Sequence, residues 1–312
     1  MKILILGGTY FLGRAFLKEL LTGDTVEKTS LSVTLFNRGT RPLPFEIHEY
    51  AKNKGIEIKE IAGDRKDAAA IENIPDGHFD VIVDFCGYDE GDIRLVTENL
   101  KASFFQYIFV STCDVYRRGN GGYIDETGEF EDRSFGGEAG EYITGKVALE
   151  KELPKAVSEK GAVWTSIRPA FIYGPYNYAP REGIYFRWID NAGQIISPSD
   201  SEGHFRMVYV RDAAKAIAMC AGNSKAYNRA LNLAGDEKLT YEGFSEILRK
   251  ATGKDFTEIK LPVADIYGRE IPLPFPLTKE ESEDYDGRTV KSVLEGFSYT
   301  PVEEGMAETY RS

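Results

Sequence analysis

The sequence predicts an α/β protein with a doubly wound parallel sheet and a smaller C-terminal lobe. Three observations lead to this fold class. Through residue 168, short apolar runs of strand length alternate with helical patterns. The first apolar run ends in a glycine-rich loop that opens a helix. From residue 169 onward the alternation stops, and glycine, proline and aromatic residues become dense.

The apolar runs predict six strands in the first part of the chain. They lie at residues 3–6, 32–36, 56–61, 81–83, 107–110 and 163–167, and continuous apolar runs of this kind suit parallel strands buried on both faces. Apolar residues at helical spacing, such as Leu12, Phe16 and Leu20, predict helices at residues 11–21, 67–74, 93–100 and 142–157. Residues 1–168 are therefore expected to form a dinucleotide-binding domain.

The second part of the chain is expected to divide between the large domain and a smaller lobe. Helical spacing predicts helices at residues 212–220 and 241–251, and an apolar run predicts a strand at 230–233. Four prolines between residues 262 and 276 favour loops. We expect residues 205–236 to return to the large domain. Residues 169–204 and 237–312 are expected to form a substrate-binding lobe over the carboxyl ends of the strands.

Composition narrows the function classes. The 312 residues include 38 Lys and Arg against 50 Asp and Glu, a net charge of −12. This charge argues against a general nucleic-acid binder and against docking on anionic membranes, which leaves a small molecule as the expected partner. Three cysteines and three histidines without a CxxC spacing predict no structural metal site and fit a reducing compartment. The first apolar run stops at Gly7, so we interpret it as a strand rather than a signal peptide and expect a cytoplasmic protein.

The loop after the first strand predicts a nucleotide site of the Rossmann type. Gly7 permits a tight turn, and a glycine at position 13 lets the helix pack close to the strand. The amino end of that helix offers unpaired N–H groups to a pyrophosphate. The residues expected to bind the cofactor here are Gly7, Gly8, Thr9, Tyr10, Phe11, Leu12 and Gly13.

The end of the second strand bears on which dinucleotide binds. An acidic residue here would hold a ribose 2′-hydroxyl and repel a 2′-phosphate, but the chain has Asn37 and Arg38. Arg38 can form a charge-assisted hydrogen bond to a phosphate, which slightly favours NADP over NAD. Asn37 alone could hold the ribose of NAD, so both cofactors stay open.

A YxxxK pair supplies the candidate acid–base chemistry. Tyr142 and Lys146 are four residues apart, so phenol and ammonium share one helix face. A nearby ammonium favours the phenolate and suits the tyrosine for general acid–base work near neutral pH. Tyr50 and Lys54 have the same spacing, but they lie between the second and third strands, and we interpret them as a solvated helix face.

The order of several motifs resembles a known family. STCDVY at residues 111–116 follows the fifth strand, YITGKVALE stands at 142–150, RP at 168–169 and YGP at 173–175. With GGTYFLG at 7–13, this set resembles the extended and atypical short-chain dehydrogenase/reductases, the NAD-dependent epimerase/dehydratase family. The GGTxFLG variant is closer to the branch that includes the chloroplast stem-loop-binding proteins.

The resemblance implies roles for individual residues. Tyr142 is the expected acid–base, Lys146 binds the nicotinamide ribose and tunes Tyr142, and Thr112 hydrogen-bonds the reacting oxygen. Members of the family often dimerise, so a homodimer is expected as well. The other residues expected at the cofactor are Asp64, Arg65, Cys86 and Gly87, and those expected at the substrate are Tyr88, Asp114 and Arg206.

Departures from the family pattern leave the reaction open. Phe171 and Phe205 stand where many nucleotide-sugar members carry an Asn and an Arg near the nucleotide phosphates. Cys113 stands where the dTDP-glucose 4,6-dehydratases carry an Asp that takes part in the elimination, and this replacement disfavours dehydration. Tyr10 replaces a glycine of the family loop, and there it either narrows the site or covers the cofactor.

Three hypotheses follow: an NAD(P)-dependent epimerase or oxidoreductase acting on a sugar or nucleotide-sugar, a net NADPH-dependent reductase of a small carbonyl compound, and a non-catalytic nucleotide- or RNA-associated protein. The presence of Thr112, Tyr142 and Lys146 together with an acidic charge counts against the third.

Overall fold

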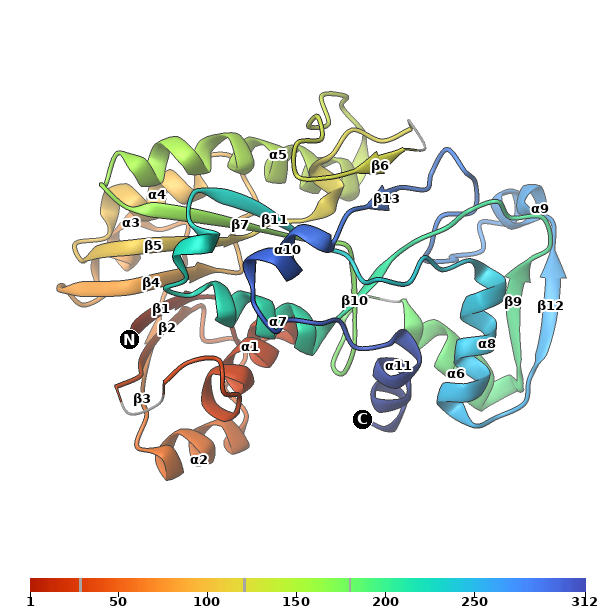
Figure 1. Cartoon of the computed structure of the whole chain (residues 1–312), viewed down its shortest axis with the longest axis horizontal. Coiled ribbons are helices and arrows are strands. Elements are labelled where there is room, and N and C mark those ends of the chain that lie inside the picture. Colours follow the sequence, from red (N-terminus) through yellow and green to blue (C-terminus); the bar gives the residue numbers. More distant parts are fainter. Residues whose placement is uncertain (28–29, 120–121, 180) are drawn as a thin grey trace.

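A parallel sheet of seven strands forms the centre of the larger part of the molecule (Figure 1). The computed structural model describes residues 1–27, 30–119, 122–179 and 181–312. The strand order β11-β7-β5-β4-β1-β2-β3 is doubly wound, because the chain runs outward from β1 in both directions. The strands are β1 (Lys2–Leu6), β2 (Ser32–Asn37), β3 (Glu57–Ala62), β4 (His78–Asp84), β5 (Ser103–Val110), β7 (Val163–Pro169) and β11 (Arg229–Leu233).

Helices cover both faces of this sheet, as Figure 1 shows. On one face α1 packs against α7, and its Phe16 and Leu20 are fully buried, as the helical spacing predicts. On the other face α5 packs against α4 over β4, β5 and β7. The helices are α1 (Phe11–Thr22), α2 (Phe45–Lys54) and α7 (Val210–Cys220) on the first face, and α3 (Ala68–Glu72), α4 (Asp92–Asn99) and α5 (Gly137–Ser158) on the second.

The predicted fold class is confirmed, with shifted element bounds. Several strands are longer than their apolar runs, because ladder hydrogen bonds continue through polar residues: β4 begins at His78, and β5 begins at Ser103. The edge strand β3 is largely exposed, which the sequence pattern did not indicate. The second YxxxK tyrosine, Tyr50, lies on α2 with 41% of its surface exposed, as interpreted from the sequence.

A second group of elements, most of which follow β7 in the sequence, lies beyond the carboxyl ends of the strands of the large sheet (Figure 1). Three small parallel pairs are β8 (Phe171–Tyr173) with β10 (Met207–Tyr209), β9 (Gln194–Pro198) with β12 (Thr257–Leu261), and β6 (Tyr123–Ile124) with β13 (Asp284–Tyr285). The remaining helices are α6 (Glu182–Ala192), α8 (Tyr241–Thr252), α9 (Val263–Gly268), α10 (Arg288–Val293) and α11 (Val302–Arg311), with short 3₁₀ turns η1 (Cys113–Val115) and η2 (Ser224–Ala226).

The proline-rich C-terminal stretch is not all loop, contrary to the expectation. Pro262 and Pro301 are the residues that precede the first turns of α9 and α11, where a missing N–H costs nothing. Within residues 205–236, α7 and β11 lie with the large sheet, whereas β10 pairs with β8 outside it. None of the helices in the described ranges combines the length and the apolar character that crossing a bilayer requires.

Candidate functional site

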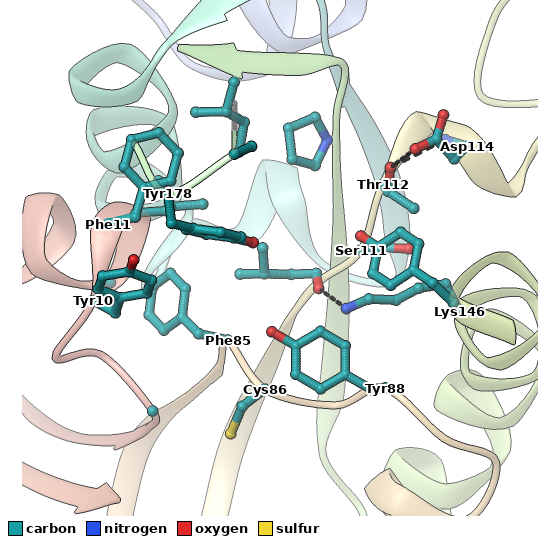
Figure 2. Close-up of a pocket in the computed structure, with 18 of the residues that line it drawn as sticks. Tyr10, Phe11, Phe85, Cys86, Tyr88, Ser111, Thr112, Asp114, Lys146 and Tyr178 are labelled. Atoms are coloured by element: carbon teal, nitrogen blue, oxygen red, sulfur yellow. Dashed lines mark hydrogen bonds between the residues drawn. The ribbon is translucent and has the colours of Figure 1, made fainter. Parts of the chain in front are cut away.

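A cavity of about 750 Å³ lies at the carboxyl ends of the strands and runs from the glycine loop into the C-terminal lobe (Figure 2). It brings together nearly all the residues that the sequence predicts for the site. Those on its wall are Gly7, Gly8, Thr9, Tyr10, Phe11, Leu12, Gly13, Asn37, Arg38, Asp64, Arg65, Cys86, Tyr88, Thr112, Asp114, Tyr142, Lys146 and Arg206.

The glycine loop has the geometry that a dinucleotide pyrophosphate requires. Gly7 and Gly8 have φ angles of +88° and +91°, which side chains rarely adopt. A Cβ on Gly13 would lie 2.4 Å from the Cα of Gly8, so only glycine lets α1 approach the loop this closely. No side chain caps the amino end of α1, and residues of this end line the cavity, so the helix end is open to a phosphate. The residues present therefore fit a bound dinucleotide.

Tyr10 is part of an aromatic stack at the edge of this cradle. Its ring lies 5.0 Å from the ring of Tyr178 at an angle of 25°, and the Arg41 guanidinium lies 3.7 Å from the Tyr10 ring centroid on the wall of the same cavity. Tyr178 comes from the loop after β8 and reaches toward the side of the cavity that carries Lys146 and Tyr88 (Figure 2). Tyr10 thus narrows the cavity rather than closing it.

The end of β2 forms the rim on the other side of the glycine loop. The side-chain oxygen of Asn37 accepts a hydrogen bond from the Gly39 N–H at 2.7 Å, which fixes the turn. Arg38 is exposed on the cavity wall, and Arg41 follows three residues later. Two arginines at and after the end of β2 thus lie on the cavity wall.

Arg65 lies on the cavity wall and Gly87 does not line it, and both make close contacts within the protein. The Arg65 guanidinium is buried and binds both carboxylate oxygens of Asp84, at 2.6 and 2.8 Å, and the carbonyl of Asp92 at 2.6 Å. It stabilises the ends of β3 and β4 rather than offering a free charge to a cofactor. Gly87 lies behind the cavity wall, where a Cβ would meet the Phe109 ring at 3.1 Å and Asp84 at 3.2 Å. The sequence carried no sign of this buried ion pair.

Helix α5 places Tyr142 and Lys146 on the cavity wall, one turn apart, as predicted. Gly145 explains how the helix reaches the loop after β4, because a Cβ there would lie 1.9 Å from the Tyr88 carbonyl oxygen. The Tyr88 ring consequently lies 6.2 Å from the Tyr142 ring, and the Lys146 Nζ lies 4.9 Å from the Tyr88 ring centroid. Thr112 lies at the end of β5 on the same wall (Figure 2).

The electrostatics of this group differ from the expectation. Burial and the Asp114 carboxylate raise the pKa of Tyr142, although a hydrogen bond with Thr112 opposes the rise. Burial outweighs the effect of the Lys146 charge on the phenol; the Lys146 Nζ donates to the Val110 carbonyl at 2.8 Å and lies 5.8 Å from the Tyr142 ring centroid. Burial lowers the pKa of Lys146 itself to about 8. At neutral pH the phenol is therefore protonated and the amine is largely charged.

Replacing Lys146 with methionine is expected to stabilise the free protein. The pKa falls from 10.5 to about 8 on folding, so the buried ammonium costs up to about 3 kcal/mol at pH 7. Loss of the bond to Val110 offsets about 1 kcal/mol of the gain. Urea unfolding at pH 7 should show a more stable Lys146→Met variant, and the gain should shrink as the pH rises from 8 toward 10.5, where the unfolded wild type also loses its proton. The exposed Lys151→Met variant is the control, and equal stability changes in the two would contradict the account.

The family-like motifs meet in a buried polar network below the cavity. Glu150 accepts bonds from Arg168 at 2.7 and 2.9 Å and from Ser166 at 2.5 Å. Arg168 also donates to the Tyr116 hydroxyl at 2.7 Å, and that hydroxyl donates to the Asn232 side chain at 2.7 Å. These residues come from α5, β7, the segment after β5 and β11. The network therefore fixes the positions of the elements that carry Thr112 and Tyr142.

The two charged residues predicted at the substrate, Asp114 and Arg206, each form an ion pair within the protein. Asp114 binds the Arg118 guanidinium and accepts a hydrogen bond from the Thr112 hydroxyl at 3.2 Å. Arg206 binds Asp284 at 2.5 Å and donates to the carbonyls of residues 235 and 236. The Arg206 charge is thus already paired by Asp284, while the residue lies on the cavity wall, so its place at the substrate stays a prediction.

The two phenylalanines that depart from the family pattern lie together in the structure. Phe205 stacks on Phe275 with ring centroids 4.0 Å apart, and the Phe171 ring lies edge-on 5.6 Å from Phe275. Phe171 and Phe205 are both on the cavity wall. The substrate end of the cavity thus has an aromatic wall at this place.

Several wall residues were not predicted from the sequence. Tyr178, Arg41, Arg118 and Glu283 all line the cavity. Tyr178 stood in an aromatic-rich stretch, and Arg118 follows the STCDVY motif closely, so both had a weak signal. Glu283 comes from a segment more than 160 residues beyond Arg118, and nothing in the sequence pattern placed it there.

Comparison with known proteins agrees with this geometry. A family model for the NAD dependent epimerase/dehydratase family matches residues 3–234. The chain is 31% identical over 281 residues to the chloroplast stem-loop binding protein of 41 kDa b from Arabidopsis thaliana, which covers 88% of this chain and 70% of that protein. This relative belongs to the branch indicated by the GGTxFLG variant.

Solved structures of similar proteins share the fold over the whole chain. A UDP-glucose 4-epimerase from Thermotoga maritima, solved with UDP-glucose, superimposes with a TM-score of 0.74 at 19% identity, covering 100% of this chain and 98% of that one. A dTDP-glucose 4,6-dehydratase from Bacillus anthracis, solved with NAD, gives 0.73 at 16% identity, covering 100% and 96%. Since the family model spans most of this chain, the protein belongs to the NAD-dependent epimerase/dehydratase family.

Proposed function

We propose that this protein is an NAD(P)-dependent oxidoreductase or epimerase that acts on a hydroxyl or carbonyl group of a sugar or nucleotide-sugar through Thr112, Tyr142 and Lys146. The observation that supports it most is the single cavity that joins the glycine loop to these three side chains. The epimerase from Thermotoga maritima was solved with UDP-glucose and the dehydratase from Bacillus anthracis with NAD, which agrees with this class of ligands.

The proposed roles follow from the contacts of each residue. A bound nicotinamide dinucleotide supplies a hydride donor or acceptor. The glycine loop would hold its pyrophosphate, and Lys146, a buried ammonium at neutral pH, would hold its ribose hydroxyls. The Thr112 hydroxyl would hydrogen-bond the reacting oxygen of the substrate. The Tyr142 phenol would give a proton to that oxygen in reduction or take one from it in oxidation.

Net reduction of a small carbonyl compound is the second candidate function, favoured by the exposed Arg38 on the cavity wall and by Phe171 and Phe205 in place of diphosphate contacts. A phenol with a raised pKa is a proton donor at neutral pH, and proton donation is what carbonyl reduction needs. The two reactions differ in whether the cofactor is consumed. The near-ultraviolet absorbance of the reduced nicotinamide measures its consumption. Loss of one reduced nicotinamide per product molecule would identify a reductase. Product formation without loss of that absorbance would identify an epimerase.

Arg38 is proposed to favour NADP over NAD. Its exposed guanidinium on the cavity wall can form a charge-assisted bond to a 2′-phosphate, which NAD lacks. We expect Arg38→Ala to weaken NADP binding by about 1–3 kcal/mol and to leave NAD binding nearly unchanged. Isothermal titration of both cofactors would measure this. Equal weakening of both would mean that Arg38 does not read the 2′-phosphate.

The stem-loop-binding relative makes RNA association a further hypothesis for this chain. A net charge of −12 works against phosphate binding, so we expect a gel-shift assay with hairpin RNA at physiological salt to detect no complex. A salt-sensitive complex would reverse this expectation. The homodimer implied by the resemblance stays a prediction.

A further inference from the structure

Three polar groups on the wall of the substrate end have a buried atom without a partner. Among the described residues, the Ser111 hydroxyl, the Arg118 Nε and one carboxylate oxygen of Glu283 make no hydrogen bond. Ser111 and Glu283 are 4% and 5% exposed, so water does not solvate them freely. A buried polar group without a partner is costly, and folded proteins rarely retain one without a ligand or a water to satisfy it. All three residues line the same cavity.

These groups continue from the reacting residues as one row. Ser111 precedes Thr112, whose hydroxyl donates to Asp114 at 3.2 Å, and Asp114 binds Arg118 (Figure 2 shows Ser111, Thr112 and Asp114). The Glu283 carboxylate accepts from the Gly119 N–H at 2.8 Å and interacts electrostatically with Arg118. These contacts therefore connect Thr112 to Glu283, which belongs to the C-terminal part of the chain.

The chemistry of the unpartnered atoms selects the ligand. The Glu283 oxygen accepts hydrogen bonds, the Arg118 Nε donates one, and the Ser111 hydroxyl can do both. A ligand that satisfies all three needs donors and acceptors close to one another, which adjacent hydroxyl groups supply. A phosphate has no donor at neutral pH and would be repelled by the Glu283 carboxylate.

The surroundings disfavour a diphosphate as well. The charges of Arg118 and Arg206 are each paired with a carboxylate. Arg181 donates to the Ile172 carbonyl at 2.9 Å, and its guanidinium lies 5.2 Å from the ring centroid of Phe171. Phe171 and Phe205, which line the same cavity and pack against Phe275, have side chains without a hydrogen-bond donor.

We propose that Ser111, Arg118 and Glu283 form a hydroxyl-binding subsite, and that the substrate is a small polyhydroxylated carbonyl compound or alcohol without a nucleoside diphosphate. This inference rests on the proposed function. In the reducing direction the carbonyl carbon takes a hydride from the reduced nicotinamide dinucleotide, and its oxygen takes a proton from Tyr142. The products are the alcohol, the oxidised dinucleotide and a phenolate that regains its proton from solvent.

The test uses substrates with and without hydroxyl groups. The wild-type protein with NADPH or NADH should reduce D-glyceraldehyde with a kcat/KM at least about tenfold above that for propanal, since only the former can satisfy the subsite. Ser111→Ala and Glu283→Gln should lose most of this preference through a higher KM for D-glyceraldehyde. Glu280→Gln, a change of the same kind at an exposed position, should keep it.

Two binding and stability measurements do not depend on activity. Ser111→Ala should leave the midpoint of thermal unfolding of the free protein unchanged or raise it, because the change removes an unpartnered hydroxyl. A lower midpoint would indicate a structural role for Ser111 and overturn the inference.

Isothermal titration of UDP into the protein saturated with dinucleotide should give no heat of binding. Three other results would likewise overturn the inference. The first is micromolar binding of UDP, and the second is a higher kcat/KM for UDP-glucose than for D-glyceraldehyde. The third is that protein which binds the dinucleotide does not reduce D-glyceraldehyde.

These outcomes separate the inference from the proposed function. Turnover of UDP-glucose that depends on Tyr142 would contradict the subsite and support the proposed function. Absence of dinucleotide binding would contradict the proposed function itself.

Discussion

Tyr142→Phe is expected to lower kcat by at least about a hundredfold, the usual contribution of a positioned general acid. The change removes one oxygen atom and keeps the ring that packs beside Tyr88. The variant therefore removes the proposed proton donor and little else. Dinucleotide affinity should stay within about twofold of wild type, because the cradle at the glycine loop is unchanged. Steady-state kinetics and isothermal titration on the same preparation would measure both quantities.

The chain supplies a matched control for this prediction. Tyr50 begins the second YxxxK, but it lies half exposed on α2 and away from the cavity wall. Tyr50→Phe should therefore leave kcat unchanged. Retention of wild-type activity by Tyr142→Phe would contradict the assignment of the acid–base role, whatever the control does.

Glu150→Ala is expected to destabilise the protein by about 3–5 kcal/mol, the usual cost of removing one partner of a buried ion pair. The variant leaves the Arg168 guanidinium, which is 6% exposed, without its carboxylate. It also leaves the Ser166 hydroxyl without an acceptor. Urea unfolding at neutral pH would measure the change as a lower midpoint. Because the network fixes α5 against β7, we expect activity to fall at temperatures where the protein is still folded.

The control for this variant is an exposed ion pair of the same chemistry. Lys250 and Glu303 are 3.0 Å apart, and half or more of each side chain is exposed. Glu303→Ala should have little effect on the midpoint, since solvent screens such pairs. If Glu150→Ala does not yield folded protein, Glu150→Gln keeps the shape and should show an intermediate loss. Equal midpoints for Glu150→Ala and Glu303→Ala would contradict the account of the network.

Local pattern was enough to predict the sheet and the place of Thr112, Tyr142 and Lys146 on one cavity wall. The apolar runs that became β1, β4 and β5 are hydrophobic because parallel strands are buried on both faces, and this leaves a signal in the chain itself. Tyr142 and Lys146 share a helix face by spacing alone. The glycine loop was predictable because positive φ angles and close approach leave few alternatives to glycine.

Pairing between distant residues was not predictable. Arg65 was expected at the cofactor because of its position after β3, and its buried ion pair with Asp84, 19 residues away, left no sign in the pattern. Arg206 was expected at the substrate, and its partner Asp284 lies 78 residues away. Glu283 reaches the cavity through the pairing of two-residue strands, which carry no periodic signal. The direction of the Tyr142 pKa also depends on burial, which spacing does not reveal.

The central claim is that the cavity binds a nicotinamide dinucleotide at the glycine loop. Thermal unfolding of the purified protein with saturating NAD, NADH, NADP or NADPH tests it most directly, because a ligand that binds only the folded state raises the unfolding midpoint. Protein from the same preparation is denatured to identify any nucleotide already bound. The account predicts a higher midpoint with at least one dinucleotide, most of all with NADP or NADPH, or release of a dinucleotide on denaturation. No shift with any of the four and no released nucleotide would contradict it.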